Sequence, residues 1–162
     1  MANKSKASTA KTMPMRILDE KGIAYQPRPQ SHKQLTAEGV AQDLGVAVAW
    51  VVKAMILQCS DRSFALAVIP GDRQLSLKKA GAVLNDKNVQ LAQHRDVERV
   101  TGFQVGAVSV LGYRRDDIPS YLDRAVLDLE RVVISSGRPD MGLELDPHDL
   151  QRAMGAHVED LS

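Results

Sequence analysis

Residues 50–69, which read WVVKAMILQCSDRSFALAVI, decide the fold of this chain. Two apolar runs, at residues 50–59 and 64–69, flank a polar tetrapeptide at residues 60–63. Apolar runs of this length around a short polar turn predict two core strands that pair as a hairpin. A single charge, on Lys53, interrupts the first run.

The patterns on either side of this hairpin alternate between helix and strand without strict βαβ order. Capping residues and apolar periodicity predict short helices at residues 12–22, 36–45, 75–84, 96–102 and 147–154. Strands are expected at residues 89–92, 127–134 and 141–145, with an edge strand at 23–30 and a mixture of strand and loop at 104–110. We therefore expect a mixed α/β fold, with one curled sheet of six or seven strands and short flanking helices.

Length and composition indicate one globular domain. The chain has 162 residues, of which 44% are apolar and 25% charged, an ordinary balance for a folded domain. We expect this domain over residues 12–162, after a flexible, polar and basic tail over residues 1–11. No apolar run reaches the roughly 20 residues that span a bilayer, and no apolar segment follows the basic N-terminus. These features predict a cytoplasmic protein that does not bind membranes.

Net charge and cysteine content limit the expected partners and the cellular compartment. A net charge of +1 does not indicate a dedicated nucleic-acid binder, so DNA is not an expected partner. Local basic patches can still contact phosphates. Cys59 is the single cysteine, which excludes an internal disulfide and agrees with a reducing compartment. A buried, inert thiol is the ordinary interpretation of Cys59, and a nucleophile is the alternative.

Several well-known catalytic motifs are missing from the sequence. It contains no phosphate-binding loop, no paired-histidine zinc helix and no Gly-x-Ser-x-Gly elbow. The four histidines, His32, His94, His148 and His157, are scattered and have no metal-ligand spacing with cysteines or carboxylates. We therefore expect neither a cofactor nor a metal.

Lys53 is the strongest candidate for a functional residue, because all its near neighbours are apolar. An ammonium group withdrawn from water costs several kcal/mol unless it is paired, so this strand should open onto a pocket or an edge. In the ordinary interpretation the stem packs on the core and the charged head reaches solvent. In the functional interpretation the charge lies in a dry cleft and stabilises developing negative charge.

Two further segments have both an ordinary and a functional interpretation. Residues 102–112, GFQVGAVSVLG, form either plain turns or a backbone that a ligand approaches closely. Residues 135–138, SSGR, form either a polar hairpin loop or a loop at the rim of a substrate pocket, where hydroxyl and backbone groups contact the substrate. The basic pairs at 78–79 and 114–115 are solvated faces or phosphate contacts.

An ordered set of segments connects these features. They are VKAMIL at 52–57, LAVIPGD at 66–72, LSLKK at 75–79, TGFQVGAVS at 101–109, ISSG at 134–137 and LEL at 143–145. In this order they resemble the YbaK and prolyl-tRNA-synthetase-associated domain family, over nearly the whole chain from about residue 13 to 161.

The resemblance implies a function and a site. The function is hydrolysis, in trans, of the ester that joins a wrong amino acid to the terminal adenosine of tRNA, with mischarged tRNA and a prolyl-tRNA synthetase as partners. Lys53 and Gly106 match the family's catalytic positions. The implied substrate-binding residues are His32, Ala54, Ser109, Ser135, Ser136 and Gly137.

The chain departs from the cysteine-specific members of that family at four positions. Ala54 replaces a threonine, Gln30 a tyrosine and Val110 a proline. Gly142 stands in place of an acidic residue, although Asp140 is close by. These departures leave the catalytic scheme intact but do not support a preference for cysteine.

Two alternatives from other functional classes remain open at the level of sequence. A non-catalytic module would bind tRNA or a synthetase through the same cleft, although six aromatic residues are too few for an open base-stacking platform. A pure assembly partner would instead present a large exposed apolar patch.

Overall fold

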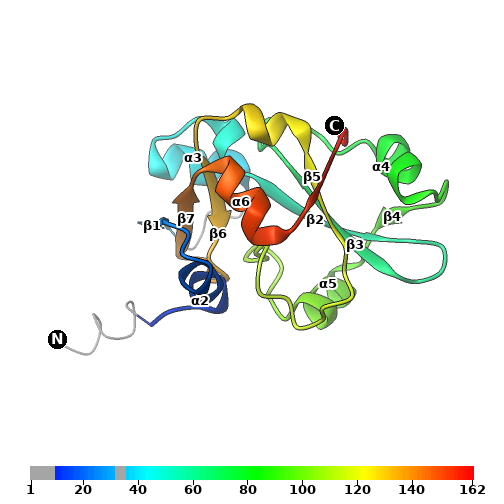
Figure 1. Ribbon diagram of the computed structural model, residues 1–162, viewed down its shortest axis with the longest axis horizontal. Coiled ribbons are helices and arrows are strands. Elements are labelled where there is room, and N and C mark those ends of the chain that lie inside the picture. Colours follow the sequence, from blue (N-terminus) through cyan, green and yellow to red (C-terminus); the bar gives the residue numbers. More distant parts are fainter. Residues whose placement is uncertain (1–9, 32–35) are drawn as a thin grey trace.

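The computed structural model describes residues 10–31 and 36–162, which form two sheets surrounded by short helices (Figure 1). The three-stranded sheet consists, in order, of β1 (Gln26–Pro29), β7 (Met141–Leu145) and β6 (Val132–Ser135). The five-stranded sheet consists, in order, of β4 (Gln90–Leu91), β2 (Lys53–Gln58), β3 (Phe64–Ile69), β5 (Ser120–Asp123) and β8 (His157–Glu159).

The helices lie close to the predicted positions. They are α2 (Met13–Glu20), α3 (Ala37–Leu44), α4 (Leu77–Leu84), α5 (His94–Thr101) and α6 (Pro147–Met154), with 3₁₀ turns η1 (Val48–Trp50) and η2 (Arg124–Asp128). Their ends follow from local chemistry. At the start of α6, for example, the Asp146 carboxylate accepts hydrogen bonds from two backbone N–H groups. Gly155, in the left-handed conformation, ends that helix.

The predicted hairpin is confirmed. Strands β2 and β3 pair antiparallel, with Lys53 opposite Ile69 and Gln58 opposite Phe64. Every residue of β3 is buried, as expected for a continuous apolar run at the centre of a sheet. Lys53 is therefore the first residue of a strand whose partner lies in the core.

The mixed α/β class is confirmed, but the strands form two sheets instead of one curled sheet. β3 pairs antiparallel with β2 and parallel with β5, and β5 pairs parallel with β8. An isolated parallel bridge between Val51 and Val133 joins the two sheets. Residues 104–110 contain no strand, and β5 and β8 lie where the sequence pattern predicted none. The predicted tail at 1–11 falls almost entirely outside the described residues and stays a prediction.

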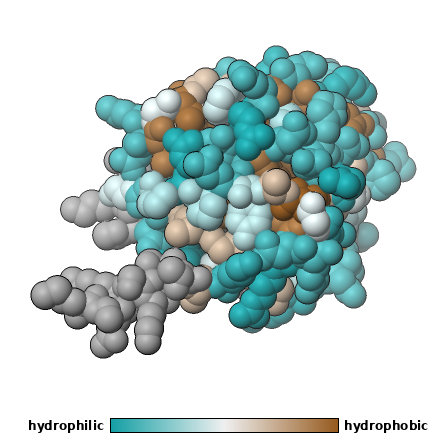
Figure 2. Space-filling model, turned by 60° about the vertical axis from the view of Figure 1, so that its left-hand side comes forward, coloured by the Kyte–Doolittle hydropathy of each residue, from teal (hydrophilic) through white to brown (hydrophobic). Residues whose placement is uncertain are grey.

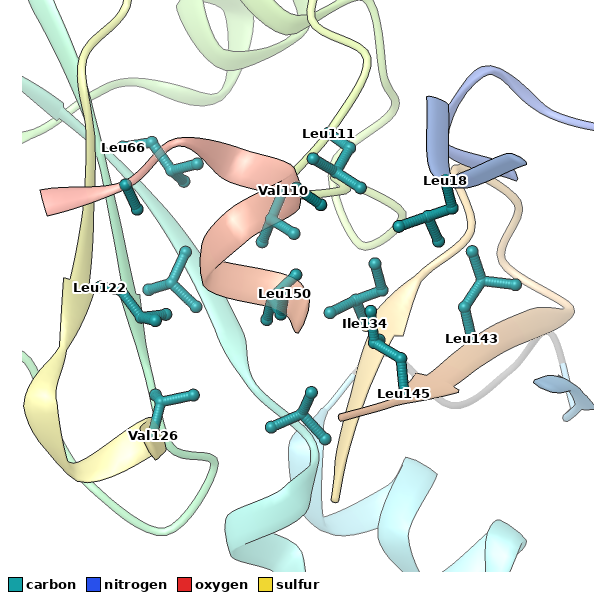
Figure 3. Close-up of a cluster of buried hydrophobic side chains, with 14 of the residues drawn as sticks. Leu18, Leu66, Val110, Leu111, Leu122, Val126, Ile134, Leu143, Leu145 and Leu150 are labelled. Atoms are coloured by element: carbon teal, nitrogen blue, oxygen red, sulfur yellow. The ribbon is translucent and has the colours of Figure 1, made fainter. Parts of the chain in front are cut away.

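One hydrophobic core connects both sheets through α6. Figure 3 shows Leu150 of α6 between Leu66 and Leu122 of the five-stranded sheet and Ile134 and Leu143 of the three-stranded sheet. These five side chains are at most 1% exposed. Burying one such side chain contributes about 1.5–3 kcal/mol, so this shared core fixes how the two sheets meet.

The face of the molecule drawn in Figure 2 is mainly polar. Apolar atoms gather on it only in small groups. Among the described residues, the large apolar side chains that are exposed are Met13, Leu77, Leu91 and Val105. Within the same part of the chain, none of the helices has the length and apolar character needed to cross a membrane.

Glu144 of β7 ties the three-stranded sheet to its surroundings. Its carboxylate accepts hydrogen bonds from Arg28 and, at 3.2 Å, from the Nε of Arg131. Arg28 also donates to the carbonyl oxygen of Leu44 at 2.9 Å, which links β1 to α3. The Glu144 side chain is only 12% exposed, so both ion pairs are partly shielded from solvent.

We predict that Glu144→Ala lowers the free energy of unfolding by about 2–3 kcal/mol, because it leaves two guanidinium groups partly buried without their acceptor. Urea unfolding at neutral pH measures the change. Asp160→Ala is the matched control, since Asp160 pairs with Lys79 through side chains that are 61% and 44% exposed. That control should lose less than about 1 kcal/mol. Equal losses in both variants would contradict the structural role of Glu144.

Tyr113 carries a buried hydroxyl that has no hydrogen-bond partner among the described residues. Its ring packs edge-to-face on Phe103, with 6.2 Å between the ring centres. Burial raises the pKa of the Tyr113 hydroxyl far above its ordinary value, because the phenolate would lose its hydration.

We predict that Tyr113→Phe raises the free energy of unfolding by about 1 kcal/mol, because it removes an unpaired polar atom and keeps the ring contact. The folded-state pKa lies above the unfolded one, so wild-type stability falls relative to the variant as the pH rises above about 10. Urea unfolding at several pH values tests both points. A variant less stable than the wild type would show that the hydroxyl has a partner.

Candidate functional site

A cavity of about 510 Å³ lies where the two sheets meet. Its walls come from α3, β2, β4, α5, β6, β7 and the glycine-containing segment at residues 102–112. Four of the residues predicted for the site, Lys53, Ala54, Gly106 and Ser135, lie on these walls. Most of the other wall residues are aliphatic, which is typical of a pocket in which a few polar groups orient a ligand.

Lys53 contributes its stem to the wall and its head to a hydrogen bond. The residue is half-buried, and its ammonium group donates to the carbonyl oxygen of Arg73 in a solvent-exposed position. The position of the charged head matches the ordinary interpretation, in which the stem packs and the head reaches solvent, although the stem lines the cavity. The charge is not enclosed in a dry hollow; it lies on the solvent side of a wall that its own stem helps to form.

Gly71 explains how the Arg73 carbonyl comes so close to Lys53. A Cβ at position 71 would lie 2.2 Å from the carbonyl oxygen of Val48 and 2.3 Å from that of Val51. The turn at residues 70–73 thus packs directly on the backbone that leads into β2. Only glycine allows this approach, because backbone atoms cannot give way as a flexible side chain can.

Gly106 lies in a tight turn on the opposite wall. The N–H of Ala107 donates to the carbonyl oxygen of Gln104 at 2.9 Å, and Gly106 has a φ of +92°. Such a φ favours glycine strongly. The N–H of Val105 donates to the Glu98 carboxylate at 3.2 Å, which anchors the turn to α5. The exposed backbone at Gly106 can therefore be approached closely by a ligand.

Two serines bind the segment 102–112 to the end of β6. The Ser135 hydroxyl donates to the carbonyl oxygen of Ala107 at 3.0 Å and accepts from the N–H of Gly137 at 3.0 Å. The Ser109 hydroxyl, fully buried, donates to the carbonyl oxygen of Ser135 at 2.7 Å. These bonds hold Gly106 and Ser135 on adjoining walls of the cavity.

Three predicted substrate-binding residues do not line the cavity. Ser109 and Ser136 are fully buried, and the Ser136 hydroxyl bonds to backbone atoms of Met141 and Arg138. Gly137 packs against Phe103. The structure gives these residues a supporting position, and direct contact with a substrate stays a prediction for each. His32, also predicted, lies outside the described residues.

The cavity also includes residues outside the predicted site residues, among them Gln30, noted as a departure from the family, and Arg138, noted as part of the segment 135–138. Gln30 and Arg138 lie on its wall, and Arg138 pairs with Asp140 at 2.8 Å. Leu91 and His94 reach the same wall because β4 pairs with β2. No local signal identifies these residues, since only the pairing of strands distant in sequence brings them together.

Metal binding and thiol chemistry find no support at this cavity. Within residues 10–31 and 36–162, no three histidine, cysteine or acidic side chains are grouped as a metal site would require. Cys59 is half-buried and follows the end of β2 opposite to Lys53. A nucleophilic role for Cys59 in this cavity would therefore require it to act from the far end of the strand.

Comparison with known proteins identifies the family of this chain. A model of the aminoacyl-tRNA editing domain matches residues 32–153. The chain belongs to this family. An Enterococcus faecalis protein provisionally named Cys-tRNA(Pro)/Cys-tRNA(Cys) deacylase EbsC is 29% identical over 144 residues, which are 88% of this chain and 87% of that protein.

Other relatives show the domain in a larger protein and in solved structures. Proline–tRNA ligase of Thermosipho africanus is 29% identical over 71% of this chain, but the match covers only 19% of the ligase. A crystal structure provisionally described as a trans-editing enzyme for prolyl-tRNA synthetase has a TM-score of 0.82 and 26% identity, covering 91% of this chain and 92% of that one. The hypothetical protein APE2540 has a TM-score of 0.84 and 27% identity, covering 90% and 96%.

We predict that Gly137→Ala destabilises the loop beside the cavity more than an ordinary glycine substitution does. Gly137 has a φ of +93°, and a Cβ there would lie 2.7 Å from Cε1 of Phe103. We expect a loss of about 3 kcal/mol. Gly155→Ala is the control, because its φ is +61° and nothing lies within 4 Å of the added Cβ. That control should lose about 1 kcal/mol in urea unfolding, and equal losses would show that Phe103 gives way freely.

Proposed function

We propose that this chain is an aminoacyl-tRNA deacylase that hydrolyses, in trans, the ester of tRNA carrying a wrong amino acid. The observation that carries the proposal is the convergence of Lys53, Gly106 and Ser135 on one cavity in a member of the editing-domain family. The relatives that match over most of their own length, rather than as part of a ligase, support action in trans.

The proposed hydrolysis requires little acid–base catalysis by protein side chains. A water molecule attacks the ester carbonyl carbon, the bond to the ribose oxygen breaks, and that oxygen leaves with the proton that the water gives up. The neighbouring ribose hydroxyl or the side chain of the amino acid can assist the attack. The Lys53 ammonium and the backbone at Gly106 position the carbonyl and offset the charge on the tetrahedral oxygen.

The size of the cavity fits an ester better than a free amino acid. A volume of about 510 Å³ holds the aminoacyl group together with part of the terminal adenosine. Leu91, Val97 and Val105 give the side formed by β4, α5 and the segment 102–112 an apolar character suited to a base. Contact alone separates amino acids that differ by a methylene by only about 10–200-fold, which is why a second, hydrolytic selection is useful.

Mischarged tRNA is the expected partner, and the cytoplasm, where tRNA is charged and used, is the expected location. The similarity to a segment of proline–tRNA ligases supports tRNA for proline as the first substrate to test. A prolyl-tRNA synthetase is the corresponding candidate protein partner.

We predict that Lys53→Ala reduces deacylation by at least about 100-fold, because it removes the cation that offsets the developing negative charge. The measurement is single-turnover release of the amino acid from a panel of mischarged tRNAs. Lys21→Ala is the matched control, since Lys21 is exposed at the end of α2 and does not line the cavity. It should retain the wild-type rate.

Two outcomes would contradict the proposal. Unchanged hydrolysis by Lys53→Ala would remove Lys53 from the catalytic machinery, provided that the unfolding midpoint of the variant matches that of the wild type. Binding of charged tRNA by the wild-type protein, without faster release of any amino acid in the panel, would identify a non-catalytic binding module instead.

A further inference from the structure

Gln30, which directly follows β1, has a side-chain oxygen without a hydrogen-bond partner at the cavity. The residue lines the cavity, and its backbone N–H donates to the carbonyl oxygen of Asp140 at 2.9 Å. Its Oε1 atom is buried and accepts no hydrogen bond from any residue in the described part of the chain. A buried carbonyl oxygen without a donor costs free energy, so its presence in a binding site calls for an explanation.

The orientation of the Gln30 amide is fixed by its other end. Nε2 donates to the carbonyl oxygen of Pro139 at 3.2 Å. Only the NH₂ group can make this bond, because a flipped amide would place two acceptor oxygens against each other. Oε1 is therefore the atom left for a ligand, and it can only accept a hydrogen bond.

Gly142 lets the Gln30 amide pack closely on β7. It lies on β7, opposite Ser135 of β6, and also lines the cavity. A Cβ at position 142 would lie 3.3 Å from Oε1 of Gln30 and 2.8 Å from Cγ1 of Val133. Any other residue would displace the amide or the wall next to it, so glycine at 142 fixes the position of Oε1 beside the cavity.

The charges on the wall indicate which group of the ligand this oxygen accepts. The α-ammonium of an aminoacyl group carries a full charge and three donors, which one neutral oxygen does not satisfy. Glu38 of α3 also lines the cavity, and its carboxylate is a better acceptor for an ammonium group. A hydroxyl needs a single acceptor, and a thiol is a much weaker donor.

We propose that Gln30 selects amino acids with a side-chain hydroxyl, such as serine and threonine, by accepting a hydrogen bond at Oε1. This inference rests on the proposed deacylase function and limits its preferred substrates to tRNA charged with a hydroxyl-bearing amino acid. A site built to bond a hydroxyl rejects the analogue that lacks it, because the buried acceptor is then left unpaired. Gln30 is therefore a specificity-determining residue, and Lys53 carries the chemistry.

Two pairs of substrates test the inference, seryl- against alanyl-tRNA and threonyl- against valyl-tRNA. Within each pair the tRNA is the same, and uncatalysed hydrolysis is subtracted from each single-turnover rate. The wild type should favour the hydroxyl-bearing member of at least one pair by about 10-fold or more. Gln30→Met retains the length of the side chain without the acceptor, so it should bring that ratio close to one while hydrolysis of alanyl- or valyl-tRNA continues.

Gln26→Met is the matched control, because Gln26 is an exposed residue of β1, the strand that leads to Gln30. It should preserve the wild-type ratio. Equal wild-type rates within both pairs would overturn the inference and leave the deacylase function standing, as would a Gln30→Met protein that still prefers the hydroxyl. Failure of the wild type to hydrolyse any ester in a wider panel would overturn the proposed function itself. The wild-type ratio decides the matter even if Gln30→Met does not fold.

Discussion

The structure depends on a short piece of backbone, residues 51–53, that serves both sheets. Val51 bridges to Val133 of β6, and the N–H of Val52 donates to the carbonyl oxygen of Val133 at 3.2 Å. One residue later, Lys53 pairs with Ile69 in the other sheet. The two sheets therefore separate beside Lys53, and the cavity opens there. Because Gly71 packs on the same backbone, the turn that offers its carbonyl to the lysine belongs to this junction as well.

The second wall of the cavity is held by two serine hydroxyls that bond to backbone groups. The Ser109 and Ser135 hydroxyls each bond to the backbone of the other segment, so the turn at Gly106 cannot move without breaking bonds to β6. Buried hydroxyls that satisfy backbone groups in this way rigidify a loop that would otherwise lack regular structure. The site thus consists of one wall built by strand pairing and one built by side-chain hydrogen bonds, which explains why serines predicted to bind substrate lie behind the surface.

Local patterns in the sequence predicted the hairpin, the helix ends and the class of fold, because caps and apolar runs act over a few residues. They did not predict two sheets, since β5 and β8 are short and their parallel pairings join residues far apart in the chain. Of the residues implied by the resemblance, Lys53, Gly106 and Ser135 lie on one cavity, and their roles stay predictions. Gln30 could not be recognised as a buried acceptor, because Pro139 and Gly142, which define its surroundings, lie more than 100 residues away.

The four positions at which the resemblance implies a departure from cysteine-specific members lie together in the structure. Gln30, Ala54, Val110 and Gly142 all line the same cavity as Lys53. Because these side chains line the cavity, they can change the amino-acid preference while Lys53 and Gly106 keep the proposed chemistry. At Gln30, where the resemblance implies a tyrosine in cysteine-specific members, an amide replaces a phenol. Under the proposed selection the site thus offers a directed acceptor for a hydroxyl in place of an aromatic ring.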